Sequence, residues 1–447
     1  MKKYYYILLL LFLVKNITAQ EKEIKFSMDE AINYAIKNNY NVKIAINNIM
    51  TAKKRKWETT TIGLPQINAK IDYQNWLKQQ VSLLPAEITG GVSGTFIPIK
   101  FGTKQNVKAS ITLTQLIFDG SYLVGLQSAK TYLKISNLAK EKTKLRIKEA
   151  VINAYGNVLV AIKSIEILEK NKAILEKNLN DVKKIYENGF NEEEDIEQLQ
   201  ITLGNLNSQL NRIKRLKKIG LKMLNIVLGN SINTLLILTD TLDSLITENV
   251  DLNLITKSFK LESHIDYKIA TNDREGRRLL MRLEQSKALP SVRAFVNYGT
   301  AGNSNTFSFL KSSQKWYNSS LMGISLNIPI FSSLRRSSKT AQAKITLENA
   351  DILLEETKEK LNLAVVSAKS DYQFAIEQYE TAKQNLSLAE RIEKKQQIKF
   401  FEGISTSFNL SQAQNQLYTQ QQNYVQSMLA VIAKKAALED ALNIPIK

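Results

Sequence analysis

The chain has 447 residues, no cysteine, one histidine and a net charge of +19. The lack of cysteine excludes disulfides, thiolate metal sites and a lipid-modified N-terminal cysteine. No nucleophile–base constellation or phosphate-binding loop is visible in the sequence. We therefore predict that the chain is not an enzyme and has no catalytic residues, no cofactor and no metal site. Lys alternates with Glu along the predicted helices, as in Lys140-Glu141-Lys142, which favours solvated helix faces and no nucleic-acid partner.

Residues 1–19 have the composition of a signal peptide. Lys2 and Lys3 form a positive start, residues 4–14 are apolar, and Ile17-Thr18-Ala19 forms a small-residue cleavage site that would leave Gln20 at the new N-terminus. The apolar run is too short to span a bilayer. In the mature chain we expect no run that is long and apolar enough for a transmembrane helix.

The first structural repeat is predicted over residues 20–228. Ser27 and Glu30 form a capping box that begins a helix, which runs to about Ile62. The period of the apolar residues then changes to two, which predicts a strand pair within 66–118 that is joined by a loop at 77–106. The apolar positions of the two strands are Ile67, Ala69, Ile71, Tyr73, Val107, Ala109, Ile111, Leu113 and Ile117.

A very long helix follows the strands, from about Ser121 to Glu187. At about 1.5 Å per residue it would be about 100 Å long. It breaks at residues 188–191, and a return helix runs over 192–228. Residues 229–258 contain Asn, Thr and Asp turn signals and are predicted to be an irregular connector.

Residues 259–447 are predicted to be a second structural repeat. A helix ends at Leu289-Pro290, a strand pair lies within 291–331 around a Gly/Asn/Ser-rich loop at 301–319, and a second long helix begins at Ser332. It breaks at Glu402-Gly403, and its return helix ends near Ala441. We expect His264 on a helix surface. Identical residues recur 214 positions apart, which indicates a duplication. The pairs include Ala154 and Ala368, Ala161 and Ala375, Gly189 and Gly403, and Gln198 and Gln412.

The apolar and small residues of the second long helix recur from Leu361 to Ala389 in alternate steps of four and three, the 3.5-residue period of supercoiled helices. Because the helices use their apolar stripes on one another, the strands need another cover. Their length and alternation fit tilted strands in an outer membrane. An open four-stranded sheet is not viable in lipid, whereas three chains would close a barrel. The predicted fold class is therefore α plus membrane β-barrel, with duplicated strand pairs and long helical hairpins in each protomer and a trimeric 12-stranded barrel.

In such a barrel the apolar phase of each strand would face lipid. The predicted lipid-facing residues are Ile71, Ile111, Val296 and Ile324. Aromatic residues cluster at the strand ends, where interfacial girdles belong. They are Tyr73, Trp76, Phe118, Tyr298, Trp316, Tyr317 and Phe331.

Several loose motifs occur twice and in the same order. Leu64-Pro65 and Leu289-Pro290 precede strands, residues 113–120 (LTQLIFDG) and 326–331 (LNIPIF) precede the long helices, and the tips read YENG at 186–189 and FEGIS at 401–405. Over its mature length the chain thereby resembles the TolC-type outer-membrane efflux proteins. The resemblance implies a homotrimer in outer-membrane lipid, with a 12-helix barrel in the periplasm. It also implies docking through the tips onto a periplasmic adaptor (membrane fusion) protein that serves an inner-membrane transporter. The implied docking residues are Gly189, Phe190, Gly403 and Ile404.

The resemblance also implies an entrance gate, with a departure. In the family, acidic residues six and nine positions after the second tip glycine ring the closed entrance, but this chain has Asn409 and Gln412 there. The first copy has Asp195 at the equivalent position, and Glu192 lies three residues before it on about the same helix face. The candidate gate residues are therefore Glu192, Asp195, Asn409 and Gln412. Stabilisation of a helix N-terminus by acids is an equally simple explanation of this cluster.

The predicted function is a passive outer-membrane exit duct of a tripartite efflux system. The alternatives are the outer-membrane duct of a type I protein-secretion system and a coiled-coil scaffold that forms no channel. Fractionation separates the scaffold from the ducts, and the neighbouring genes separate efflux from secretion.

Overall fold

The computed structural model describes residues 23–189 and 192–444, so the predicted signal segment and Phe190 lie outside the described residues. The chain forms two compact units. Unit 1 comprises residues 1–48, 136–270 and 353–447, and unit 2 comprises residues 49–135 and 271–352. Each unit takes segments from both sequence copies, so the units cut across the predicted repeats. The repeat boundaries at 228 and 259 stay a prediction.

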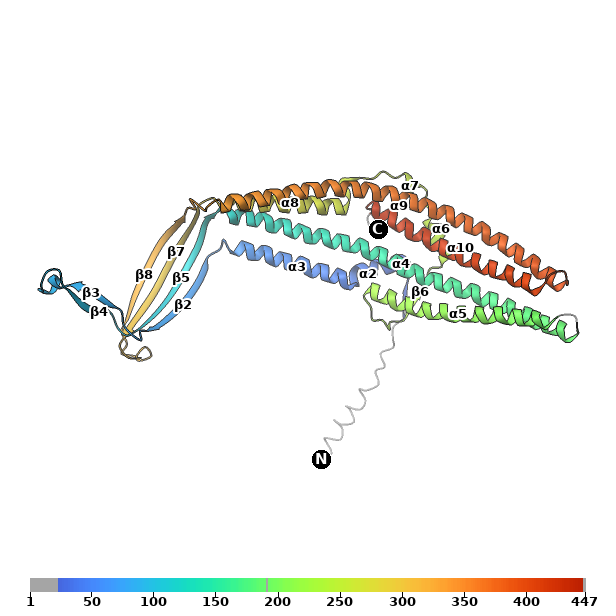
Figure 1. The fold of residues 1–447 in the computed structure, drawn as a ribbon, viewed down its shortest axis with the longest axis horizontal. Coiled ribbons are helices and arrows are strands. Elements are labelled where there is room, and N and C mark those ends of the chain that lie inside the picture. Colours follow the sequence, from blue (N-terminus) through green and yellow to red (C-terminus); the bar gives the residue numbers. More distant parts are fainter. Residues whose placement is uncertain (1–22, 190–191, 445–447) are drawn as a thin grey trace, which may run out of the picture. The chain divides into compact units, whose positions relative to one another are not determined.

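Unit 2 contains a four-stranded antiparallel sheet in the order β2-β5-β7-β8 (Figure 1). The strands are β2 (Gln66–Asn75), β5 (Gln105–Asp119), β7 (Ser291–Ser304) and β8 (Trp316–Asn327). Each copy contributes one predicted strand pair, and the central pairing of β5 with β7 joins the copies. The alternating sequence thus forms strands, as its period predicts.

The predicted loop at 77–106 contains structure of its own. A hairpin of β3 (Val81–Pro85) and β4 (Phe96–Lys100) surrounds a short 3-10 helix, η2 (Ala86–Thr89). The sequence pattern does not predict this hairpin because its strands are only five residues long and apolar residues occupy both of their faces.

Unit 1 contains parts of two helical hairpins that repeat each other. The first consists of α4 (Gly120–Glu187), which begins in unit 2, and α5 (Glu193–Leu228). The second consists of α9 (Arg335–Phe401), which also begins in unit 2, and α10 (Ser407–Ala441). The long helices end 214 residues apart, at Glu187 and Phe401, which agrees with the offset of the sequence repeat.

The predicted helix over 27–62 is two helices, α2 (Met28–Asn38) and α3 (Tyr40–Thr61), and the capping box of Ser27 and Glu30 is present. The break lies at the buried Asn39. Its side chain donates to the carbonyl of Val227 at 2.6 Å and accepts from the backbone N–H of Asn41 at 2.8 Å. Asn39 therefore caps the start of α3 while it anchors the chain to α5.

The predicted irregular connector contains short elements. β6 (Leu236–Leu238) pairs in parallel with β1 (Ile24–Phe26), and α6 (Leu242–Asn249) and α7 (Asn253–Thr256) follow it. One buried tyrosine from each long helix forms a hydrogen bond to these short elements. Tyr155 donates to the carbonyl of Phe26 at 2.9 Å, and Tyr372 donates to the carbonyl of Asn249 at 2.7 Å.

Two predictions about single features are wrong. His264 is buried, with 4% of its surface exposed, because it lies at the junction of η3 (Leu261–Ser263) and α8 (Ile265–Ser286). In addition, α4 contains one window that is long and apolar enough to cross a membrane by composition alone. Half of that window is buried within the described residues, where Val151, Tyr155 and Val158 belong to the packed interior. The window is apolar because it packs against other helices.

Candidate functional site

One face of the unit 2 sheet is apolar across all four strands. The strand register places Ile67, Leu113, Val296 and Met322 in one row across the sheet, so their side chains share a face. The predicted lipid-facing residues all lie on this face and are exposed: Ile71 by 76%, Ile111 by 52%, Val296 by 46% and Ile324 by 76%. No helix or loop among the described residues covers them. An apolar face of this extent marks an interaction site or a membrane surface.

The other face of the sheet is mostly polar. One row across it consists of Asn68, Thr112, Asn297 and Leu321, and the Asn297 amide donates to the Thr112 hydroxyl at 2.6 Å. Lys70 and Asp72, two residues apart on the same face, form a 3.0 Å ion pair. The sheet therefore has the apolar-out, polar-in pattern of a membrane barrel wall.

A bulge in β5 interrupts the alternation near the helix. Leu116 pairs with Arg293 and Phe118 pairs with Val292, so Ile117 is the extra residue. Phe118, rather than the predicted Ile117, continues the apolar face. Such bulges commonly occur where a strand bends at the rim of a barrel.

The sheet has two free edges within the described residues. β2 pairs only with β5, and β8 pairs only with β7. Each edge leaves a row of backbone N–H and C=O groups without a strand partner, which is not viable in lipid. The single chain thus has a membrane-type sheet that is incomplete without further strands.

Aromatic residues gather beside the loop of the β7–β8 pair. The ring of Tyr73 lies 6.0 Å from that of Phe307 and 6.1 Å from that of Phe309, and Phe309 lies 6.4 Å from Trp316. Tyr73 and Trp316 were expected in an aromatic girdle. Phe307 and Phe309 were missed because they lie in a Gly/Asn/Ser-rich loop.

The helical tips in unit 1 are glycine turns. Gly189 and Gly403 have φ values of +79° and +70°, which favour glycine because it has no side chain to clash. At the second tip, the N–H groups of Gly403 and Ile404 bond back to the carbonyls of Phe400 and Lys399, which satisfies the end of α9. Ile404 is 76% exposed and Phe408, which the sequence analysis missed, is 66% exposed. The second tip therefore presents apolar side chains beside a hydrogen-bonded glycine turn.

The four gate candidates lie at the starts of two helices, α5 and α10. Glu192 is the N-cap residue of α5 without a side-chain capping bond, and Asp195 is half-buried in the first turn. Asn409 and Gln412 are exposed on the first turns of α10, where Thr406 accepts from the Asn409 N–H at 3.3 Å. Both pairs thus lie on first turns that follow a tip, which is compatible with a gate and equally with helix capping.

A polar seam behind the tips was missed by the sequence analysis. The buried hydroxyls of Thr202 on α5 and Ser411 on α10 lie 3.1 Å apart, and Gln198 donates to Ser411 at 3.3 Å. Asn171 on α4 donates to Gln421 on α10 at 2.7 Å. Polar residues at single seam positions fix the register of helices, and these positions show as interruptions of the apolar period.

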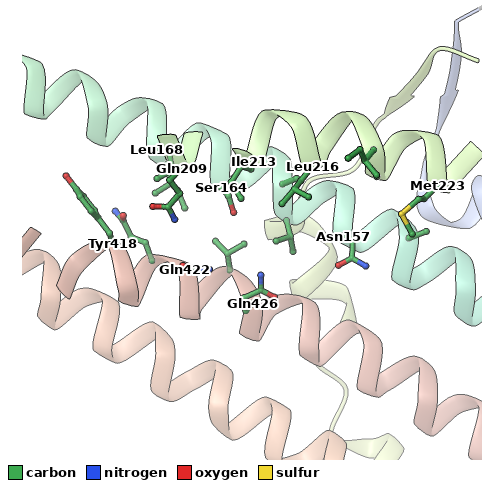
Figure 2. Close-up of a pocket in the computed structure, with 18 residues that line it drawn as sticks. Asn157, Ser164, Leu168, Gln209, Ile213, Leu216, Met223, Tyr418, Gln422 and Gln426 are labelled. Carbon is green, nitrogen blue, oxygen red and sulfur yellow. The ribbon is translucent and has the colours of Figure 1, made fainter. Parts of the chain in front are cut away.

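Between α4, α5 and α10 lies a cavity of about 340 Å³ (Figure 2). None of its 18 lining residues carries a charge, although 23% of the chain is charged. Leu216, Ile219 and Met223 form its α5 side and are also exposed on the surface. With Ile226 they follow steps of three and four residues, the spacing of a helix seam that has no partner within the described residues.

Residues 265–443 match the model of the protein family described as outer membrane efflux protein. This part of the chain is similar to that family. The resemblance to TolC-type outer-membrane efflux proteins is thereby confirmed. The similarity to a family described as outer membrane efflux protein also supports the prediction that the chain is not an enzyme. A search of curated protein sequences finds no match.

The fold is similar to that of solved outer membrane proteins and channels. The chain is 16% identical to CusC, with a TM-score of 0.73, and the match covers 93% of this chain and 92% of CusC. The CusC structures were described in terms of folding and transmembrane channel formation. It is 14% identical to the outer membrane protein VceC from Vibrio cholerae, with a TM-score of 0.71 and coverage of 94% and 97%. It is 16% identical to the outer membrane channel CmeC from Campylobacter jejuni, with a TM-score of 0.69 and coverage of 93% and 85%. At these identities the comparison establishes the fold, and the predicted class of long helical hairpins joined to a membrane-type sheet is confirmed.

Proposed function

We propose that this chain forms the outer-membrane exit duct of a tripartite efflux system, with its sheet in the outer membrane and its helices in the periplasm. One observation carries the proposal. Within the described residues, the sheet is apolar on one exposed face, polar on the other, and unpaired at both edges. A soluble coiled-coil scaffold would have to cover that face. Lipid covers it directly, and a lumen uses the polar face.

The duct would be a homotrimer. Three copies of the sheet give twelve strands and remove every free edge, which an isolated chain cannot do. The exposed α5 stripe of Leu216, Ile219, Met223 and Ile226 supports this assembly, because it offers a helix-packing surface to a neighbouring protomer. α9 exposes apolar residues of its own on which such a helix could pack. They are Ile352, Leu363, Val366 and Phe374.

Assembly can be tested on the outer-membrane fraction. The wild-type protein should run as a trimer in sodium dodecyl sulfate without heating and as a monomer after heating. Ile219→Glu places a charge in the α5 stripe and should greatly reduce the trimer band. Asn211→Glu, on an exposed α5 position outside the stripe, should leave it unchanged. A wild-type protein found only in the soluble fraction would contradict the duct, and an intact Ile219→Glu trimer would contradict this interface.

The partners would be a periplasmic adaptor, docked on the tips, and an inner-membrane transporter that supplies the energy. The exposed Ile404 and Phe408 beside the Gly403 turn support docking there, since apolar and aromatic side chains commonly act as anchors at binding surfaces.

Docking can be tested with the double variant Ile404→Arg and Phe408→Arg. It should retain the trimer, because both side chains are exposed, and should lose crosslinking to the adaptor and most transport. Asn415→Arg, an exposed change further along α10, is the matched control. Full transport by the double variant would show that the tips act only as turns.

A further inference from the structure

The positive charge of the chain is concentrated in unit 2. This unit holds 23 of the 61 Lys and Arg residues but only 9 of the 42 Asp and Glu residues, so it carries +14 of the net charge of +19. Most of these charges are on the helices that adjoin the sheet, α3, α4, α8 and α9, rather than on the strands. Unit 2 is the part of the chain that contains the membrane-type sheet.

Four of the residues on these helices lie close to the strand ends. Lys53 and Trp57 are four residues apart on α3, which ends at Thr61 before β2, and Arg278 and Arg282 are four apart on α8, which ends at Ser286 before β7. Each pair therefore lies on one helix face. At about 1.5 Å per residue, Trp57 and Arg282 lie about 6 Å from their helix ends and Lys53 and Arg278 about 12 Å. All four are within reach of a lipid headgroup layer.

Contacts to α4 fix which sides of α3 and α8 are free. The Tyr122 hydroxyl of α4 donates to the carbonyl of Thr60 on α3 at 3.1 Å, and Asn272 on α8 donates to the carbonyl of Thr131 on α4 at 3.3 Å. α3 and α8 therefore flank α4. α3 and α8 run in the same direction on either side of α4. Residues 53 and 57 lie about a quarter turn around α3 from its α4-facing side. Residues 278 and 282 lie about a quarter turn around α8 from its α4-facing side, in the opposite sense. The two pairs consequently share one face of the helix layer.

The opposite face of the layer is the one that continues the polar strand face. There Arg55 donates to the Tyr132 hydroxyl at 2.8 Å, and Ser121 lies eleven residues before Tyr132 on the same side of α4. The side-chain hydroxyl of Ser121 donates to the Asp119 carboxylate at 2.5 Å, and Asp119 pairs in the sheet with Ser291 on the polar face. The face with Lys53 and Arg282 thus continues the apolar strand face. Leu123, turned away from Ser121, is 51% exposed, and Trp57 is 60% exposed.

This face combines the side chains that anchor proteins at a bilayer surface. Trp rings lie at the headgroup level, and Lys and Arg near the membrane attract anionic lipid. Lys53 and Arg282 form no salt bridge within the described residues, while Arg278 is paired with Glu275 at 2.6 Å. Lys53 and Arg282 therefore have positive charge available for an external phosphate.

We propose that Lys53, Trp57, Arg278 and Arg282 form a band that binds the headgroups of anionic phospholipids in the periplasmic leaflet. The band rests on the barrel proposed above, because it needs the sheet to lie in the bilayer. It selects lipid by charge, whereas the apolar strand face does not.

The test uses the purified full-length protein in phosphatidylcholine vesicles that contain a trace of spin-labelled phosphatidylglycerol or spin-labelled phosphatidylcholine. The fraction of immobilised label gives the relative affinity. Wild type should prefer phosphatidylglycerol, and salt should weaken the preference. Lys53→Gln with Arg282→Gln should reduce it by about fivefold for each charge removed. Arg55→Gln with Arg277→Gln makes the same charge change on the opposite face and should retain the wild-type preference.

Three results would overturn the band. One is no preference in the wild-type protein, and another is an equal loss in the control pair. The third is that the protein shows no lipid preference but binds isolated cell-wall polymer in a way that depends on Lys53 and Arg282. Resistance to carbonate extraction is measured on the same vesicles. Protein that does not insert contradicts the barrel, whereas inserted protein without the preference contradicts only the band.

Discussion

At the residue scale, the strand side chains decide whether the sheet is a membrane wall. Ile324 and Ser325 are neighbours on β8 whose side chains point to opposite faces, and Ile324 is 76% exposed. We predict that Ile324→Lys destabilises the folded protein by about 2–4 kcal/mol near the bilayer midplane, because a charge then faces hydrocarbon. Ser325→Lys should have a small effect. Unfolding by denaturant from lipid vesicles measures both changes, with Ile71→Lys and Thr112→Lys as a second matched pair.

Equal losses of stability in the two members of each pair would contradict the assignment of the faces. A lipid face accounts for the expected difference, since all four positions lie in paired strands. A soluble sheet would tolerate Lys at its exposed Ile324 at least as well as at Ser325.

Residue environments could be predicted only where a period governs them. The lipid-facing candidates follow from alternation alone, because one strand face must be apolar throughout. Asn39 and His264 could not be placed in this way. Asn39 interrupts a continuous helical pattern because its side chain bonds to α5, 188 residues away, and His264 is buried by contacts with α10. Neither contact has a local signal.

At the element scale, the start of α8 is held by a neutral histidine. The His264 Nδ1 atom accepts from the backbone N–H of Asp266 at 3.1 Å, as an N-cap side chain does, so the other ring nitrogen carries the proton. Burial lowers the pKa of His264, and the nearby Lys142 ammonium adds to this effect, while Asp266 and Asp440 oppose it. Asn443 joins the same site, since its side chain accepts from the N–H of Ile265 at 3.1 Å.

Protonation of His264 should weaken this junction. Its pKa is near 6.5 in the unfolded chain and lower in the folded protein, so the stabilisation is complete above pH 6.5 and is lost as pH falls toward the folded value. Asp440 acts in the opposite sense, because burial raises its pKa and the folded state then loses stability as pH rises. Lys148 and Glu439 nearby form a 2.6 Å ion pair.

The measurement is the melting temperature at pH 7.5 and pH 5.5. His264→Asn keeps a capping acceptor but does not titrate, so its decrease at pH 5.5 should be smaller than that of wild type. His264→Ala loses the cap and should be less stable by about 1 kcal/mol at pH 7.5. The junction does not depend on the histidine charge if His264→Asn and wild type show the same pH dependence.

Elements with a strong period were predictable and those without one were not. The ends of α4 and α9, 214 residues apart, follow from the repeat. The strands of the β3–β4 hairpin and the short elements of the connector could not be predicted, because each has at most eight residues, too few to establish a period. The seam around Ser411 escaped because buried polar residues there look like solvated positions until their partners on α5 are known.

At the scale of the whole molecule, assembly into a trimer would explain features that are incomplete in one chain. The free edges of β2 and β8, the exposed α5 stripe and the apolar sheet face each need a partner that the chain does not supply within its described residues. A trimer in lipid would supply a neighbouring strand, a neighbouring helix and hydrocarbon, respectively. The sequence could predict these needs because each follows from unsatisfied hydrogen bonds or uncovered apolar area.

A trimer would also bring the acidic tips together. Residues 192–195 are four consecutive acids in a chain of net charge +19, and three copies would surround the periplasmic entrance. Successive helical residues point about 100° apart, so only some of the four can face the lumen. Asp195 and Glu192, three residues apart, share a side of the first turn of α5, where Asp195 is half-buried and Glu192 is exposed. We propose that this pair forms the charged constriction.

The constriction and simple helix capping predict different conductances. An acidic ring should make the reconstituted channel cation-selective and sensitive to divalent or trivalent cations. Glu192→Gln with Asp195→Asn should abolish both properties, while Glu193→Gln with Glu194→Gln removes the same charge from the exposed neighbours and should leave them largely intact. Trimer yield should be equal for both double variants, because the removed acids contribute only about 0.3–1 kcal/mol each to a helix start. If selectivity and cation block survive in the first double variant, the acids stabilise α5 and the gate lies elsewhere.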